Sequence, residues 1–245
     1  GLMDLQLHPD YDKNGWIYIS YSYFDELSRN KSNTAIIRAR LKKDKLVDQE
    51  TIYMGVPSLS TRHHFGSRIE FDQEGYLYFT IGDRGKRDKF PQTLDNSNGK
   101  VHRLFDDGRI PEDNPFVNQK GTEESIYSYG HRNIQGMAMH PVTGEIWTHE
   151  HGPKGGDEVN IIEKGQNYGW PVISYGINYS GTKFTDLTHK EGMEQPVIQW
   201  TPSIAPCGTT FVTGDRYPGW KNNILIGSLR FEYLERVELK DNKVI

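Results

Sequence analysis

The sequence predicts an all-β protein, and in particular a β-propeller built from four-stranded antiparallel blades. Two observations lead to this prediction. The chain is rich in aromatic residues, with 14 tyrosines and 5 tryptophans, and such residues favour half-buried strands over a helical bundle. One pattern of strands and turns also occurs four times along the chain, and radial repetition of a four-stranded unit is typical of propellers.

Each repeated unit begins with a small residue and an alternating apolar strand, followed by a polar turn and a second, more apolar strand. In the second unit, for example, Ile69 and Phe71 lead through the turn 72–75 into the strand 76–81. The units begin near residues 1, 66, 136 and 208. We therefore expect a single propeller domain over residues 1–245.

Each unit then offers candidates for its outer strands. Third strands are expected at residues 34–41, 99–104, 158–162 and 234–240, and fourth strands at residues 52–56, 125–129 and 196–200. The fourth unit lacks a candidate for its outermost strand and the first begins abruptly. We therefore expect a piece of a larger ring, truncated at both ends, of which about four blades are covered. A β-sandwich with chance self-similarity is the alternative fold.

Composition and charge exclude several classes of function. The formal charge of −4 gives no reason to expect a nucleic-acid partner. The densest basic stretch, residues 84–89, is expected to be a solvated loop. No apolar run is long enough to span a bilayer, and no signal peptide is visible. The single cysteine, Cys207, excludes an intrachain disulfide framework.

The repeat also predicts where the unusual polar residues lie. If the strands of a blade run up and down, the loops before each first strand and after each second strand open on the same face of the propeller. Candidate residues stand in both kinds of loop: His63, His64, Asp83, Arg132, Asn133, residues 150–153 and Arg230. We therefore expect them to converge around the axis at one end of the molecule.

His64 and Asp83 form the candidate catalytic pair. The strand beginning at Gly66 follows the histidine directly, and Asp83 follows the neighbouring strand, where a carboxylate could orient the imidazole. An oriented imidazole is the usual general base because its pKa lies near neutral pH. The alternative is that one of the two adjacent histidines is a buried partner and the other a solvated neighbour.

Two further motifs raise the question of a metal site. In residues 149–151, with the sequence His-Glu-His, the histidines would share one face of a strand while Glu150 points away. No third ligand stands at a familiar spacing, so zinc is not expected. Asp157 and Glu158 follow a Gly-Pro-Lys-Gly-Gly loop with accessible carbonyls, and hard oxygen ligands on a flexible loop suit calcium. The alternative is an ordinary solvated acidic pair.

Together these motifs make the sequence similar to the soluble quinoprotein glucose/sorbosone dehydrogenase family, and in particular to its bacterial aldose sugar dehydrogenases. The resemblance covers nearly the whole chain and rests on residues 64–68, 81–83, 129–138, 150–160 and 167–171. It implies a six-bladed propeller that oxidises the C1 hydroxyl of aldose sugars using pyrroloquinoline quinone (PQQ) and Ca²⁺. It also implies a periplasmic or secreted location and an external electron acceptor.

The resemblance further implies a role for individual residues. His64 would be the general base and Asp83 its orienting partner. The cofactor would be contacted by Arg132, Asn133, His151 and Arg230. Relatives usually carry a lysine where Arg230 stands, and a planar guanidinium is not equivalent to a point ammonium. Glucose-oxidising relatives often carry an acidic residue at the position of His63, so the sugar preference is left open.

The resemblance implies two calcium ions. The backbone carbonyls of Gly152 and Pro153 would hold the ion that polarises the quinone, while Glu158 and the backbone of Tyr168 would form a separate, structural site. Relatives also carry further cofactor-binding arginines in a blade beyond Ile245. The sequence leaves open whether missing segments or a homo-oligomer complete the ring.

Three classes of function therefore compete. The first is a PQQ-dependent oxidoreductase. The second is a non-catalytic, calcium-stabilised propeller that binds carbohydrate or a protein partner, and the third is a metal-dependent lactonase or hydrolase. The set Arg132, Asn133 and Arg230 favours the first class, because a tricarboxylate quinone needs cationic and polar partners that a plain sugar binder does not.

Overall fold

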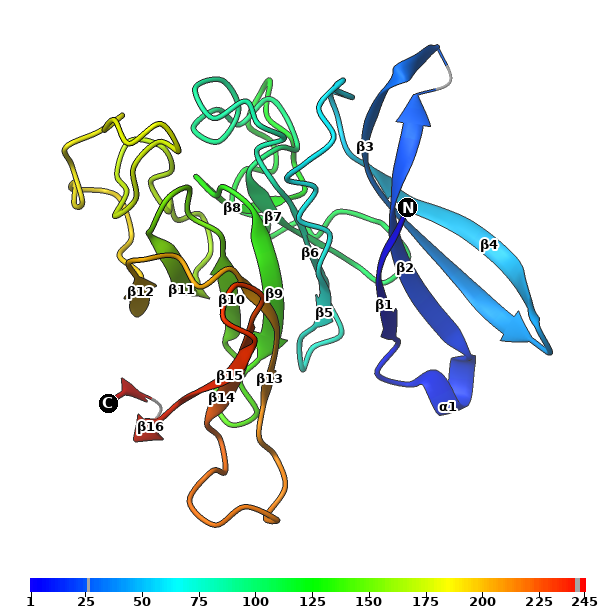
Figure 1. Cartoon of the computed structure of the whole chain (residues 1–245). Helices are drawn as coiled ribbons and strands as arrows, with labels where there is room; N and C mark the ends of the chain where they lie inside the picture. The colour runs from blue at the N-terminus through cyan, green and yellow to red at the C-terminus, as the bar shows by residue number, and fades with distance from the viewer. Residues whose placement is uncertain (26, 241–242) are drawn as a thin grey trace.

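The computed structural model describes residues 1–25, 27–240 and 243–245, in which strands that follow one another in sequence form successive antiparallel sheets (Figure 1). Blade 1 contains β1 (Leu2–Leu7), β2 (Trp16–Asp25), β3 (Ser28–Lys42) and β4 (Lys45–Met54), with the short helix α1 (Tyr11–Asn14) between β1 and β2. Blade 2 contains β5 (Ile69–Phe71), β6 (Leu77–Ile81), β7 (Lys100–Leu104) and β8 (Ile126–Tyr129). No helix in the described part of the chain has the length and hydropathy needed to cross a membrane.

The second half of the chain continues the same pattern. Blade 3 contains β9 (Ile134–Met139), β10 (Ile146–Glu150), β11 (Asp157–Ile162) and β12 (Ile198–Trp200). Blade 4 contains β13 (Pro206–Phe211), β14 (Ile224–Ser228) and β15 (Tyr233–Val237), followed by a hairpin of β16 (Leu239–Lys240) and β17 (Lys243–Val244). A long connection over residues 163–197 joins β11 to β12 and reaches the end of the molecule that carries the site (Figure 1).

The first strands of the blades lie next to one another. β5 contacts both β1 and β9, and β13 contacts β9. This order places each inner strand beside a common axis, with the other strands of its sheet further out, as in a β-propeller. The predicted fold class, all-β with four-stranded antiparallel propeller blades, is therefore confirmed, and the β-sandwich alternative is wrong.

One strand prediction needs correction. The third strand expected over residues 234–240 ends at Val237, which pairs with Ile224 of β14. Beyond it the chain leaves the sheet, because the amide of Leu239 donates to Asn223 Oδ1 at 3.0 Å and Leu239 then pairs with Val244. The two residues at the end of the expected strand therefore belong to a separate hairpin.

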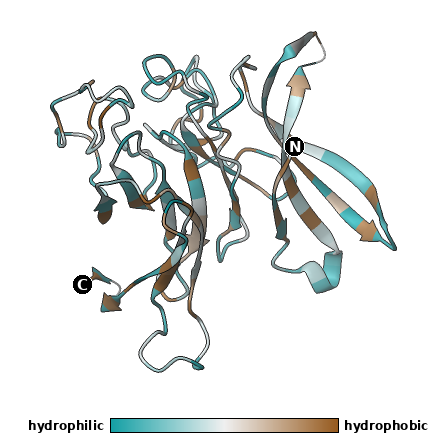
Figure 2. Ribbon diagram, in the orientation of Figure 1, coloured by the Kyte–Doolittle hydropathy of each residue, from teal (hydrophilic) through white to brown (hydrophobic). Residues whose placement is uncertain are grey.

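The hydrophobic core lies in layers between neighbouring blades. On β6, Leu77 and Phe79 pack with residues of blade 1, while Tyr78 faces the other way into the layer shared with blade 3. Trp147 of β10 is fully buried in the layer between blades 3 and 4. Because the central blades bury both faces, β6, β7 and β10 are buried along their whole length. Their buried residues are not all apolar, since Lys100 and His102 lie on β7, and hydrophilic and hydrophobic colours both occur on the strands in Figure 2.

This layering predicts unequal effects of two leucine substitutions. Leu77→Ala removes a fully buried side chain between blades 1 and 2 and should lower the free energy of unfolding by about 2–5 kcal/mol. Leu41→Ala is the matched control, because Leu41 is 55% exposed at the end of β3. Urea denaturation measures both, and equal losses would contradict the assignment of the core.

Candidate functional site

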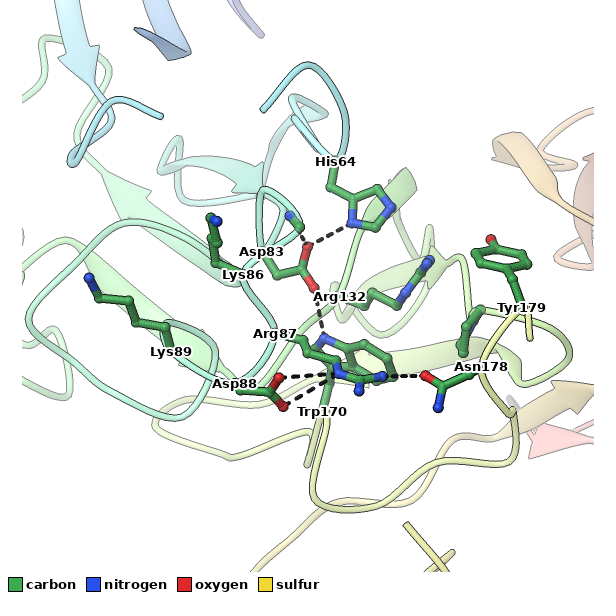
Figure 3. A pocket seen from close by; sticks show the side chains of 12 residues that line it. His64, Asp83, Lys86, Arg87, Asp88, Lys89, Arg132, Trp170, Asn178 and Tyr179 are labelled. Atoms are coloured by element: carbon green, nitrogen blue, oxygen red, sulfur yellow. Dashed lines mark hydrogen bonds and ion pairs between the residues drawn. The ribbon is translucent and has the colours of Figure 1, made fainter. Parts of the chain in front are cut away.

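Loops at one end of the propeller bring several sequence-predicted residues around one cavity of about 360 Å³. His64 comes from the connection between β4 and β5, Asp83 from the loop after β6, Arg132 from the loop before β9 and Pro153 from the loop after β10. Trp170 joins them from the long connection between β11 and β12 (Figure 3). The expected convergence at one end therefore holds for these residues.

His64 and Asp83 are in direct contact. His64 Nδ1 lies 2.6 Å from Asp83 Oδ1, and the second carboxylate oxygen accepts from Trp170 Nε1 at 2.9 Å, on the other side of the aspartate (Figure 3). Since a carboxylate accepts, the imidazole donates from Nδ1 and Nε2 carries the free lone pair. The His64 side chain is 19% exposed and that of Asp83 only 2%, so the imidazole reaches the cavity from a buried support.

Hydrogen-bond donors hold the Asp83 carboxylate in its charged form despite its burial. Burial by itself would raise the pKa of Asp83, but the hydrogen bond and charge of His64 act in the opposite direction. The amide of Gly85, at 2.8 Å, and the indole of Trp170 add two more donors. The net effect keeps the pKa of Asp83 below its ordinary value, so it is ionised near neutral pH.

Close backbone contact sets the position of His64. Its φ is +57°, a left-handed backbone conformation that residues other than glycine rarely adopt. The neighbouring loop passes so near that a Cβ on Gly82 would lie 2.4 Å from the His64 carbonyl oxygen. Only glycine allows this approach, and it places the start of the Asp83 loop directly against the histidine.

Glu150 supports the Arg132 segment and was missed by the sequence analysis, which placed its side chain away from the histidines. Its carboxylate accepts from the backbone amides of Arg132 at 2.5 Å and Asn133 at 3.3 Å. It also lies 3.0 Å from His131 Nδ1. A carboxylate at the end of the second strand of a blade, where the loops of the site begin, is the sequence signal that could have identified this role. The Arg132 guanidinium then donates to the His151 carbonyl at 2.7 Å.

The remaining cofactor candidates lie around two neighbouring cavities. His151 and Arg230 line a cavity of about 460 Å³ together with Gly152 and Pro153. Pro153 also lines the His64 cavity, so the two spaces adjoin. Asn133 instead faces a cavity of about 310 Å³ on the other side of His64. The structure thus brings His151, Arg230 and Arg132 to one side of His64 and places Asn133 on the other.

Glu158 and Tyr168 meet at a small cavity of about 10 Å³ that Glu150 also lines. Burial, together with the charges of Glu150 and Asp157, raises the pKa of Glu158 to about 8. Asp157 itself is buried, and its carboxylate accepts from the Gly152 amide at 2.8 Å. The alternative of an ordinary solvated acidic pair is therefore wrong for Asp157.

The expectation of a solvated loop over residues 84–89 is wrong at its first residue. Arg84 is fully buried, because carbonyl oxygens of two neighbouring segments accept from its guanidinium in the absence of water. Lys86 and Lys89 are exposed, and Arg87 donates to Asn178 Oδ1 at 2.8 Å across the cavity (Figure 3). A basic run alone does not show which of its members faces inward.

Fold and site together define a propeller with an oriented imidazole beside cationic side chains. Comparison with known proteins identifies the family: the model of the glucose/sorbosone dehydrogenase family matches residues 1–245, and the chain belongs to this family. The resemblance inferred from the sequence motifs is therefore confirmed.

Individual relatives agree with this assignment. The chain is 42% identical to the aldose sugar dehydrogenase YliI of Escherichia coli, over 100% of this chain and 66% of that protein. A solved apo-form structure of the Escherichia coli aldose sugar dehydrogenase matches with a TM-score of 0.95, over 100% of this chain and 71% of that one. A solved structure of a PQQ-bound aldose sugar dehydrogenase from Streptomyces coelicolor is 28% identical to the chain, with a TM-score of 0.77. The match covers 100% of this chain and 64% of that one. The chain spans 61–66% of the length of three curated relatives, YliI among them.

The surroundings of Asp83 predict a pH-dependent contribution to stability. A carboxyl group with a lowered folded-state pKa stabilises the protein above its unfolded-state pKa of about 3.9, and this stabilisation is lost as the pH falls through the folded-state value. Urea unfolding should therefore show Asp83→Asn to be less stable than the wild type at pH 7, with a smaller difference at pH 3. Asp44→Asn, at an exposed turn, is the control. A difference that does not change with pH would contradict the assignment.

Proposed function

We propose that this chain carries the catalytic centre of an oxidoreductase that oxidises the C1 hydroxyl of aldose sugars, with PQQ as hydride acceptor and calcium as Lewis acid. The observation that carries the proposal is the 2.6 Å contact between His64 Nδ1 and Asp83, which leaves Nε2 free at the edge of a cavity that Arg132 also lines. Aldose sugar dehydrogenases are prominent among the relatives, and one of them is described as PQQ-bound.

The chemistry assigned to His64 is removal of the proton from the C1 hydroxyl. As Nε2 takes this proton, the electron pair of the O–H bond forms the C1 carbonyl, and hydride leaves C1 with the electrons of its C–H bond. The sugar is thereby oxidised to a lactone. PQQ, when bound, supplies the two-electron acceptor for the hydride. Asp83 holds the imidazole in the tautomer that can accept and stabilises the charge that it gains.

The residues present fit a polyanionic quinone. Arg132 and Arg230 line adjoining cavities with Lys154, so that three cationic side chains reach the space beside Pro153. The Arg230 guanidinium is exposed and donates to the Ser203 carbonyl at 3.1 Å, which leaves further donors for a carboxylate. His151 donates from Nε2 to the Pro206 carbonyl at 2.7 Å, which holds its ring beside this space. The carbonyls of Gly152 and Pro153 would hold the calcium at the quinone.

The residues at the proposed structural calcium site also fit a cation. Glu158 is a carboxylate whose charge is disfavoured by burial and by Glu150, so a divalent cation would offset the repulsion. The cavity that Glu158 and Glu150 share with Tyr168 has room for about one water-sized particle. Glu150 and Glu158 pair across β10 and β11, and Thr148 pairs with Asn160 in the same two strands. Within the described residues, Thr148 Oγ1 and Asn160 Oδ1 have no hydrogen-bond partner.

We also propose that further blades complete the ring, either from additional segments or from another copy of the chain. On the outer face of blade 1, Leu5 and Leu7 are 50% and 47% exposed beside the small cluster of Ile17 and Ile19. Leu234 of blade 4 is 61% exposed. A neighbouring blade would cover such faces, as it does between blades 1 and 2. A periplasmic or secreted location and an external electron acceptor are proposed on the family resemblance alone.

His64→Ala tests the general base. The substitution should lower the rate of dye-linked sugar oxidation with added PQQ and calcium by about two to four orders of magnitude, while PQQ binding stays nearly intact. His63 is the neighbouring control: a Cβ on Gly85 of the cavity wall would lie 2.4 Å from its Nε2, so His63→Ala should mainly change the apparent sugar affinity. Turnover that survives without His64 would overturn the mechanism. A wild-type protein that is inactive with its ring completed would favour a non-catalytic propeller.

Chelation tests the structural calcium site. Calcium that binds only the folded state should stabilise it by about 3 kcal/mol at a hundredfold excess over the dissociation constant. EDTA should therefore lower the melting temperature of the wild type, and Glu158→Gln should remove most of that sensitivity. Glu163→Gln, a carboxylate of the connection just after β11, should leave it unchanged. A wild-type melting temperature that is indifferent to EDTA would remove the site from consideration.

A further inference from the structure

The Arg84 side chain is more deeply buried than that of Arg132, and the proposed mechanism assigns it no role. It is fully buried, and burial lowers its pKa to about 10. Its backbone has a φ of +53°, the left-handed conformation that costs a residue other than glycine free energy. A buried charge held on a strained backbone is costly. The hydrogen bonds of the guanidinium offset this cost.

Two of its hydrogen bonds hold the segment that carries His64. Nη2 donates to the Thr61 carbonyl at 2.5 Å and Nε donates to the His63 carbonyl at 3.0 Å. The guanidinium carbon also lies 3.6 Å from the centre of the Phe65 ring, which it covers. One planar group thus contacts residues on both sides of His64. The Thr61 hydroxyl returns a hydrogen bond to the Arg84 carbonyl at 2.7 Å.

The other hydrogen bonds tie this segment to blade 1. Nη1 donates to the Ser32 carbonyl at 2.9 Å and to Asn33 Oδ1 at 3.2 Å. Both residues belong to β3, whose central part is buried. A rigid sheet therefore anchors the guanidinium, and the guanidinium anchors the loop. A lysine could not repeat this arrangement, because its single ammonium cannot donate in three directions in one plane.

From these contacts we infer that Arg84 is a positioning residue for His64. Asp83 and Arg84 are adjacent and contact different parts of the His64 segment. Asp83 accepts from Nδ1 of the imidazole, whereas Arg84 contacts the residues before and after His64. The inference rests on the proposed function only in that it treats His64 as a base. Without Arg84, the loop would keep its sequence and its aspartate partner but lose the anchor that aims Nε2 into the cavity.

Arg84→Met tests the inference, because it keeps the length and apolar stem of the side chain and removes every donor. We expect kcat for sugar oxidation to fall about a hundredfold, the loss that a misplacement of about 1 Å can cause, with KM changed by less than about threefold. In protein free of cofactor and metal, the downfield NMR signal of the His64 Nδ1 proton, assigned by its loss in His64→Gln, should broaden or disappear. Arg84→Lys should lie between Arg84→Met and the wild type.

Arg103→Met is the matched control. Arg103 is also a buried arginine of blade 2, but it lies on β7 and not beside His64. Its Nε donates to Asn114 Oδ1 at 2.9 Å. Its loss should lower the melting temperature while kcat and the His64 signal remain. If Arg84→Met does not fold, Arg84→Lys carries the test with the same two measurements.

The outcomes separate this inference from the proposed function. An Arg84 variant that folds with wild-type kcat and an intact His64 signal overturns the positioning role. A fall in kcat that matches the fall in Arg103→Met, with the signal intact in both, also overturns it. A wild-type protein that has its ring completed and still shows no PQQ-dependent sugar oxidation refutes the proposed function instead, and the NMR signal of the cofactor-free protein still decides whether Arg84 positions His64.

Discussion

Burial of the blades against one another is the constraint on which the rest of the structure depends. Leu77 and Phe79 of blade 2 can leave water only by packing on blade 1, and Trp147 of blade 3 only by packing on blade 4. This packing fixes the direction of each strand, and therefore which loops open at the end that carries the site. His64, Asp83 and Arg132 come from three different loops, and they meet because the sheets beneath them are packed rigidly.

The site is supported by charged groups that lie below the surface of the cavity. Glu150 accepts the backbone amides of Arg132 and Asn133, and Asp157 accepts the amide of Gly152. Arg84 provides the opposite arrangement, a cation that donates hydrogen bonds to backbone carbonyl oxygens. Each of these groups satisfies backbone that is not part of a sheet ladder, and each one fixes a neighbouring residue of the site. Loops held in this way can carry functional side chains without becoming loose.

Asp83 and Glu158 have opposite electrostatic surroundings. Asp83 receives donors from His64, Gly85 and Trp170, which keep its pKa below the ordinary value despite burial. Glu158 has Glu150 and Asp157 as neighbours, and its pKa is raised to about 8. The pKa values of these two residues on adjacent blades are thereby shifted in opposite directions, because one is surrounded by N–H donors and the other by further carboxylates. In the proposed function, the first would orient the base and the second would bind a cation.

The sequence by itself determined the fold class, the positions of most strands and the family. Alternating apolar residues and glycine-rich turns are local signals, and residues such as His64, Asp83 and Arg132 stand at fixed positions relative to those strands. Local signals could not show that Arg84 is buried while Lys86 beside it is exposed, nor that Glu150 supports Arg132. They also could not show that Asn133 and Arg132, adjacent in the chain, face different cavities. Tertiary structure decided these points, because burial and hydrogen bonding depend on which distant backbone atoms lie within reach of a side chain.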